Sequence, residues 1–135
     1  MSDLYGQEHV NRYRATDGAE GHDWREGSTV LLLTTTGRKT GQKHTTPLIY
    51  QLDGDNPVIV ASKGGAPDDP GWYRNLTKDP EVEVQIKGDK FRARARTAEG
   101  ERERLWRLMN EIWPHYEEYQ TKTDREIPVV VLERM

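Results

Sequence analysis

The sequence's clearest structural signal is residues 81–96, EVEVQIKGDKFRARAR, in which apolar and polar side chains alternate on both sides of a glycine. Such alternation is typical of a half-buried β-strand, because successive side chains of a strand point to opposite faces. A two-residue turn at Gly88-Asp89 would place Ile86 opposite Phe91. One face of this hairpin is then apolar and the other pairs acids with arginines, so we expect both patterns to set the register.

Further strands are predicted on both sides of this hairpin. Residues 29–36, 45–52 and 57–62 are rich in β-branched and apolar side chains, and the turn signal at 53–56 predicts a hairpin between the last two. Residues 127–132 are almost wholly apolar, which is typical of a strand buried on both faces. We therefore expect about six strands, most of them antiparallel.

Two or three helices are predicted to flank the strands. Asp69 is expected to cap a helix that has Pro70 in its first turn and ends near residue 78. Residues 98–113 place apolar side chains at helical spacing on one face. Single short helices are expected at residues 8–16 and 116–120.

These elements predict one α+β domain, mainly β, built as a barrel or sandwich with the helices outside. The chain has 135 residues, which suits a single domain. We divide it into an N-terminal helix and loop segment, residues 1–27, and a barrel, residues 28–135.

Composition excludes several classes of function. The net charge is −3, so the protein is not a strongly basic nucleic-acid binder. Without cysteine there is no disulfide, thiolate chemistry, zinc finger or iron–sulfur cluster, and the four histidines have no metal-ligand spacing. No apolar run approaches the ~20 residues of a membrane span, and no signal peptide is recognisable, which favours a cytoplasmic location.

The loop at residues 37–44, GRKTGQKH, holds three cations and no acid. Its two glycines would let backbone N–H groups approach a ligand, so the loop could bind an anion such as phosphate. It lacks the spacing of a Walker A motif. From composition alone, a solvated hairpin loop is the favoured interpretation.

Three other groups of residues could carry chemistry. Ser62-Lys63-Gly64-Gly65 follows a strand directly, Trp72-Tyr73 with Asn75 begins a helix, and aromatic side chains crowd residues 113–119. Each suits a pocket for a flat or anionic ligand. Each also has an ordinary structural explanation: a turn, a core anchor, and aromatics that seal the end of a barrel.

Five stretches of the sequence, taken in order along the chain, resemble the deazaflavin-dependent nitroreductase family. They are LTTTGRKTG at 33–41, TPL at 46–48, VASKGG at 60–65, PGWYRNL at 70–76 and TDREIP at 123–128. The resemblance covers nearly everything from about Tyr13 onward. It implies a split β-barrel that binds coenzyme F420, a deazaflavin with a phosphate linker and an oligoglutamate tail. It also implies an enzyme that passes a hydride from the reduced cofactor to a quinone, a nitroaromatic or an activated alkene.

The resemblance also implies the residues of the site. Cofactor contacts carry over onto Arg38, Lys39, Thr40, His44, Thr46, Pro47, Ile49, Val60, Ala61, Ser62, Lys63, Gly71, Trp72 and Asn75. The substrate pocket carries over onto Trp113, Tyr116 and Tyr119, of which the two tyrosines are the catalytic candidates. Tyr116 is expected nearest the reacting substrate, which it would orient or supply with a proton.

One alternative from a different class stays open. A non-catalytic split barrel could bind F420, FMN or another planar anionic ligand such as haem, with FMN less favoured than F420. For the enzyme, the expected partner is a small-molecule electron acceptor and not a nucleic acid. A lipid quinone as acceptor would imply peripheral membrane contact, and the protein is expected to be a monomer or a homodimer.

Overall fold

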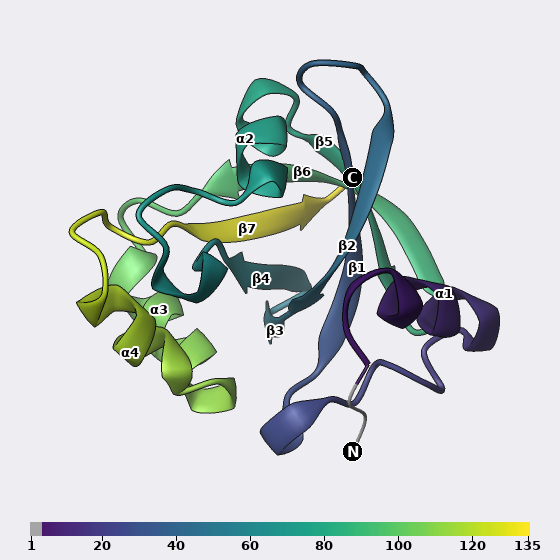
Figure 1. Ribbon diagram of the computed structural model, residues 1–135, viewed down its shortest axis with the longest axis horizontal. Helices are drawn as coiled ribbons and strands as arrows, with labels where there is room; N and C mark the ends of the chain where they lie inside the picture. Colours follow the sequence, from purple (N-terminus) through teal and green to yellow (C-terminus); the bar gives the residue numbers. More distant parts are fainter. Residues whose placement is uncertain (1–3) are drawn as a thin grey trace.

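Seven antiparallel strands form one curled sheet in the computed structural model, which describes residues 4–135 (Figure 1). Across the sheet they run in the order β2-β1-β5-β6-β7-β4-β3. Their bounds are β1 Val30–Thr36, β2 Lys43–Ile49, β3 Gln51–Asp53, β4 Asn56–Val60, β5 Glu81–Ile86, β6 Asp89–Thr97 and β7 Val129–Arg134. The predicted α+β half-barrel is confirmed.

The expected strand at residues 45–52 is divided in two. The backbone leaves the sheet at Tyr50, whose N–H donates to the carbonyl of Thr29 at 3.0 Å. The part before Tyr50, β2, pairs with β1, whereas the part after it, β3, pairs with β4 at the opposite edge of the sheet. The chain thus crosses from one edge to the other here, and this crossing raises the number of strands from six to seven.

Alternating side chains divide the apolar residues between the two faces of the sheet. Leu31, Leu33, Ile59, Val130 and Leu132 point into the curl and form its main core. The alternate residues of β4 and β7 pack instead against α3 and α4, and those of β1 pack against α1. Strand β7 is accordingly buried on both faces, as predicted.

The β5–β6 hairpin forms as predicted, but the predicted turn and the predicted register were wrong. Val84, not Ile86, lies opposite Phe91, and Lys87-Gly88 forms the turn. The predicted pairing is displaced by two residues. Because side chains alternate with a period of two, the displacement exchanges partners without moving any side chain to the other face.

Tertiary contacts explain this register. The hydroxyl of the buried Tyr13 accepts a hydrogen bond from the backbone N–H of Lys87 at 2.8 Å. Asp89, which the prediction placed in the turn, is instead the first residue of β6 and accepts two hydrogen bonds of 3.0 Å from Arg134. The first contact joins residues 74 positions apart and the second joins residues 45 positions apart, so the local pattern could not reveal them.

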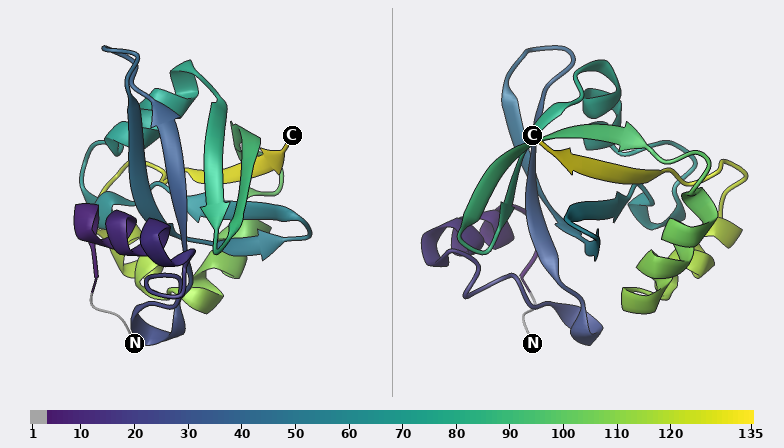
Figure 2. Two further views of the ribbon diagram at one scale, coloured as in Figure 1. Left: turned by 90° about the vertical axis from the view of Figure 1, so that its right-hand side faces the viewer. Right: turned by 180° about the vertical axis from the view of Figure 1, so that it is seen from behind.

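Four α-helices lie outside the curl in the described part of the chain: α1 Gly6–Thr16, α2 Gly71–Lys78, α3 Arg102–Ile112 and α4 His115–Thr121. Short 3-10 turns occur at Arg25–Gly27 and Lys63–Gly65. Helix α1 packs beside β2, α2 lies across β1 and β6, and α3 and α4 cover the side of β4 and β7 (Figure 2). None of the helices within residues 4–135 has the length and apolar character needed to cross a membrane.

One predicted helix start and one predicted helix cap were wrong. Helix α3 begins at Arg102 and not at residue 98, because Ala98 is still tied to the sheet by its N–H, which donates to Val129 at 2.8 Å. Helix α2 begins at Gly71 with Pro70 as its cap residue, and no side chain caps it. The Asp69 carboxylate accepts a hydrogen bond from Arg125 at 3.0 Å instead.

Candidate active site

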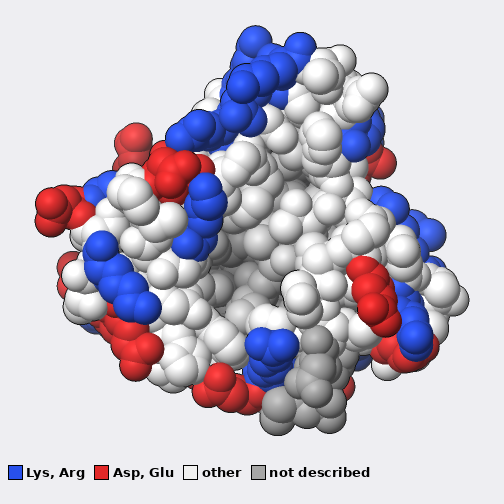
Figure 3. Space-filling model, viewed as in Figure 1, with Lys and Arg blue, Asp and Glu red and all other residues white. Residues whose placement is uncertain are grey.

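A single cleft joins two cavities between β2, α2 and α4. One cavity, of about 420 Å³, is mostly apolar, and the other, of about 390 Å³, follows the loop between β1 and β2. Thr46 and Trp72 line both, so the two cavities adjoin. Figure 3 shows the central hollow, with basic side chains gathered above it toward α2 and the β1–β2 loop.

The β1–β2 loop forms the cationic end of the cleft. Lys39 and Thr40 are exposed there, beside His44 on β2. Arg38 is held more firmly, since its guanidinium donates to Asn75 Oδ1 at 2.8 Å. Within residues 4–135 the Lys39 ammonium makes no ion pair, so this end of the cleft offers a free positive charge to an anion.

Asn75 fixes this loop to helix α2. It is buried, and its amide oxygen also accepts the backbone N–H of Arg38 at 3.2 Å. Its amide nitrogen donates to Thr35 Oγ1 at 3.2 Å. Asn75 therefore holds the loop against α2 and gives the cationic end a defined shape.

The middle of the cleft is more apolar than its cationic end. Pro47, Ile49, Val60 and Trp72 line it. Ser62 and Lys63 complete the wall at the end of β4. A flat ring bound here would contact hydrocarbon and an indole over most of its surface, which suits an aromatic heterocycle.

The inner end of the cleft is an aromatic chamber. Trp113, Tyr116 and Tyr119 line it from α4 and the residue before Pro114. Tyr116 is only 4% exposed, and burial raises the pKa of its phenol well above the ordinary value. Because its hydroxyl makes no hydrogen bond among the described residues, it is available to donate one to a ligand.

The other wall of this chamber comes from the N-terminal segment, which the sequence analysis did not assign to the site. Tyr5, His9 and Trp24 line it. The Trp24 ring stacks on Trp113 at 5.7 Å between centroids, and His9 is held by the carbonyl of Gly21 at 2.7 Å. His9 and Tyr13 are four residues apart, which places them on one face of a helix, and this spacing was the signal in the sequence that could have indicated the wall.

The cleft brings together almost all of the expected site residues. The cationic cavity contains Arg38, Lys39, Thr40, His44, Gly71 and Asn75, the apolar cavity contains Pro47, Ile49, Val60, Ser62, Lys63, Trp113, Tyr116 and Tyr119, and Thr46 and Trp72 line both. Ala61 is the exception, because it is fully buried and lines neither cavity. Its carbonyl accepts a hydrogen bond from Arg125.

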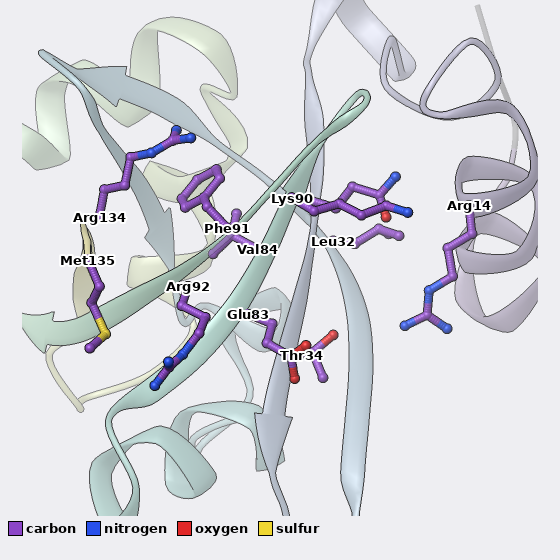
Figure 4. Close-up of a pocket in the computed structure, with 11 residues that line it drawn as sticks. Arg14, Leu32, Thr34, Glu83, Val84, Lys90, Phe91, Arg92, Arg134 and Met135 are labelled. Carbon is purple, nitrogen blue, oxygen red and sulfur yellow. The ribbon is translucent and has the colours of Figure 1, made fainter.

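Another hollow, of about 740 Å³, lies on the outer face of β1, β5 and β6 (Figure 4). Arg134 lies over the Phe91 ring there at 4.0 Å and is paired with Asp89. Arg92 is paired with Glu81 at 2.9 Å. Since none of the expected site residues lines this hollow and two of its arginines are already paired, the cleft is the better candidate site.

An ion-pair latch joins the two walls of the aromatic chamber. His115, on α4, meets Glu26 of the N-terminal segment at 3.0 Å and Glu118 at 3.3 Å. Hydrogen bonds to these carboxylates raise the pKa of His115 above its ordinary value. The latch therefore favours the protonated ring.

We expect this latch to make stability depend on pH. The folded pKa is raised, so the contribution is fully present below the unfolded pKa of about 6.5 and is lost as pH rises through the folded pKa. Thermal unfolding of wild type and His115→Gln, measured at steps from about pH 6 to pH 9, tests this. The two curves should converge at high pH, and a difference that is constant across the range would contradict the latch.

An antiparallel half-barrel with a cleft that is cationic at one end and aromatic at the other defines a class of protein that binds a planar, anionic redox cofactor. The chain belongs to the F420H(2)-dependent quinone reductase family, whose model matches residues 5–134. It is 46% identical to an F420H(2)-dependent quinone reductase of Mycobacterium tuberculosis (strain H37Rv) over 126 residues, which is 90% of this chain and 85% of that relative.

Solved structures share this fold. One, described as an F420-H2 dependent reductase (FDR-A), is 46% identical, with a TM-score of 0.72 over 77% of this chain and 93% of its own. Another, described as a domain-swapped dimer, is 42% identical, with a TM-score of 0.76 over 94% of this chain and 96% of its own. A heme storage protein, HutZ of Vibrio cholerae, shares the fold at 14% identity and a TM-score of 0.59, over 98% of this chain and 92% of its own.

Proposed function

We propose that this protein transfers a hydride from reduced coenzyme F420 to a quinone bound in the aromatic chamber. The observation that carries the proposal is that two adjoining cavities bring a cationic end, an apolar middle and an aromatic end together in one cleft. Family membership and the named relatives support the cofactor and the class of acceptor.

The residues present fit the chemistry of F420. A phosphate and a glutamate tail need cations that are not already neutralised, and Lys39 with the guanidinium of Arg38 would hold them. A deazaflavin ring needs a flat, largely apolar slot, and Trp72 with Pro47 and Ile49 would provide it. Bound there, the reduced cofactor supplies the hydride.

The aromatic chamber would hold the acceptor. Trp24, Trp113 and Tyr119 line the chamber with aromatic side chains against which a flat quinone can pack, and the lining residues that the structure describes include no carboxylate. A neutral, planar acceptor is therefore favoured over a charged one. We infer that residues 28–135 carry the cofactor, while the N-terminal segment closes the acceptor end.

Tyr116 would act as a hydrogen-bond donor to the acceptor. When a hydride reaches a quinone, negative charge develops on a carbonyl oxygen, and a fixed donor stabilises that charge. Burial raises the pKa of Tyr116, which makes its phenol a weak acid that stays protonated. We therefore infer that Tyr116 orients the quinone, whereas the proton that completes the hydroquinone comes from water at the cleft mouth.

A fluorescence titration with F420, run beside FMN at two salt concentrations, tests the cofactor assignment. The proposal predicts that F420 binds more tightly than FMN and that its binding weakens with salt, because exposed cations at the loop are screened. Preference for FMN, or binding of neither, would mean that the fold is retained without this function.

The nature of the acceptor bears on location and assembly. We propose that the acceptor is a small quinone that enters the cleft from solution. We also propose that the protein is cytoplasmic and works as a monomer or homodimer. The relative solved as a domain-swapped dimer supports the second form. A lipid quinone would require membrane contact, and co-sedimentation with quinone-loaded vesicles would reveal it.

A further inference from the structure

Arg125 lies behind the Ser62-Lys63 wall of the cleft and donates a hydrogen bond to the Ser62 carbonyl. It belongs to the TDREIP stretch, residues 123–128, and its side chain is only 15% exposed. It does not line either cavity of the cleft. Any effect on binding must therefore pass through the residues that it touches.

The Arg125 guanidinium is bound entirely to residues 61–69. Nε donates to the Ala66 carbonyl at 2.9 Å, and Nη2 donates to the Ser62 carbonyl at 2.9 Å. Nη1 donates to the Ala61 carbonyl at 3.3 Å and to the Asp69 carboxylate at 3.0 Å. Four hydrogen bonds from one planar group fix both ends of this loop, a geometry that a lysine ammonium cannot reproduce.

The loop needs such a clamp because its backbone is unusual. Lys63, Gly64 and Gly65 have φ values of 47°, 64° and 87°, three successive residues in the left-handed region. A side chain such as that of Lys63 is strained there, so the conformation persists only where its surroundings enforce it. Ser62, Lys63 and Gly64 are the residues that this loop presents to the cleft.

The same segment also holds helix α4. The Gln120 side chain donates to the Arg125 carbonyl at 2.8 Å and accepts the Ile127 N–H at 3.0 Å. A Cβ on Gly65 would come within 2.6 Å of the Tyr119 carbonyl, so loop and helix are in close contact. Residues 120–127 thus connect the cofactor wall to the helix that carries Tyr116.

We propose that Arg125 is a positioning residue that sets the Ser62-Lys63 wall relative to α4, and with it the spacing between cofactor and acceptor. This inference rests on the proposed function, since it assigns that wall to the cofactor. It predicts that the guanidinium of Arg125 controls cofactor affinity without touching the cofactor.

The test compares Arg125→Lys and Arg125→Ala with the matched control Arg102→Lys. Arg102 is also largely buried, at 21% exposure of its side chain, and it donates to the Ile127 carbonyl at 2.6 Å, but it makes no hydrogen bond to residues 61–69. Three quantities are measured: F420 affinity by fluorescence, melting temperature, and hydrogen exchange of the Gly65 and Ala66 amides in the ligand-free protein.

We expect both Arg125 variants to raise the Kd for F420 by roughly tenfold or more, and to exchange the two amides faster. Added guanidinium ion should restore affinity to Arg125→Ala, and Arg102→Lys should keep the wild-type Kd even where its melting temperature falls. If Arg125→Ala fails to fold, the F420 affinity of Arg125→Lys and the exchange rates of its Gly65 and Ala66 amides still test the proposal.

Unchanged affinity in Arg125→Lys, an equal loss in Arg102→Lys, or no rescue by guanidinium would overturn the inference. If wild type itself does not bind F420, the proposed function fails instead. The exchange of the Gly65 and Ala66 amides would then still report whether Arg125 holds the loop.

Discussion

We expect the Tyr116→Phe variant to lose roughly a hundredfold in kcat for quinone reduction while its Kd for F420 stays within about twofold of wild type. Tyr116 is a buried residue of the described chamber, and its hydroxyl makes no hydrogen bond to the described residues. Removing it withdraws a donor from the oxygen on which charge develops, but it removes no packing from the cofactor slot. The measurement is steady-state turnover with menadione, beside a cofactor titration.

Two further observations decide what Tyr116 does. Tyr73→Phe is the matched control, because its hydroxyl bonds Thr97 at 2.7 Å and does not line the cleft, so turnover should be unchanged. Because burial raises the pKa of Tyr116, the wild-type rate should show no phenol titration up to about pH 9. Full activity in Tyr116→Phe would remove this residue from the chemistry.

The second large effect is expected from reversing a charge at the cationic end. Lys39→Glu should raise the Kd for F420 by roughly a hundredfold, since hydrogen bonds to charged groups contribute about 1.5–3 kcal/mol and the new carboxylate repels the anionic tail. Because the Lys39 side chain is exposed and makes no ion pair within residues 4–135, the melting temperature should not change. The Kd of Lys39→Ala for F420 should lie between the values of wild type and Lys39→Glu.

The dependence on salt separates a direct contact from a general charge effect. Lys90→Glu makes the same change in net charge on β6, away from the cleft, and should leave affinity near wild type. Binding by Lys39→Ala should also respond less steeply to salt than binding by wild type, because one screened contact is gone. Equal losses in Lys39→Glu and Lys90→Glu would show that the loop is not the anion site.

The sequence predicted the architecture better than it predicted exact pairings. Alternation in residues 81–96 identified both faces of the hairpin, because the pattern repeats with the strand's own period. The same alternation is satisfied by any shift of two residues, so the turn at Lys87-Gly88 was decided by Tyr13 and Arg134, which lie far away in the chain. Resemblance to a family predicted an anion site in the loop at residues 37–44, where composition alone favoured an ordinary loop, and this role stays a prediction.

Long-range contacts account for what was missed in the site. Trp24 and Trp113 are far apart in the sequence, and nothing in either segment indicates that their rings stack. Arg125 lay in a recognised motif, yet its four bonds to residues 61–69 depend on how the C-terminal strand lies beside β4. Walls assembled from distant segments have no local signature, whereas loops and strands do.

Oxidation of reduced F420 by menadione, followed with catalytic amounts of the protein, tests the central claim most directly. The account predicts saturable, protein-dependent oxidation in which one quinone is reduced for each cofactor oxidised, and a strong loss of this rate in Tyr116→Phe. Tight binding of F420 without turnover of menadione or another small quinone would contradict it, and would leave a cofactor-binding half-barrel that is not a reductase.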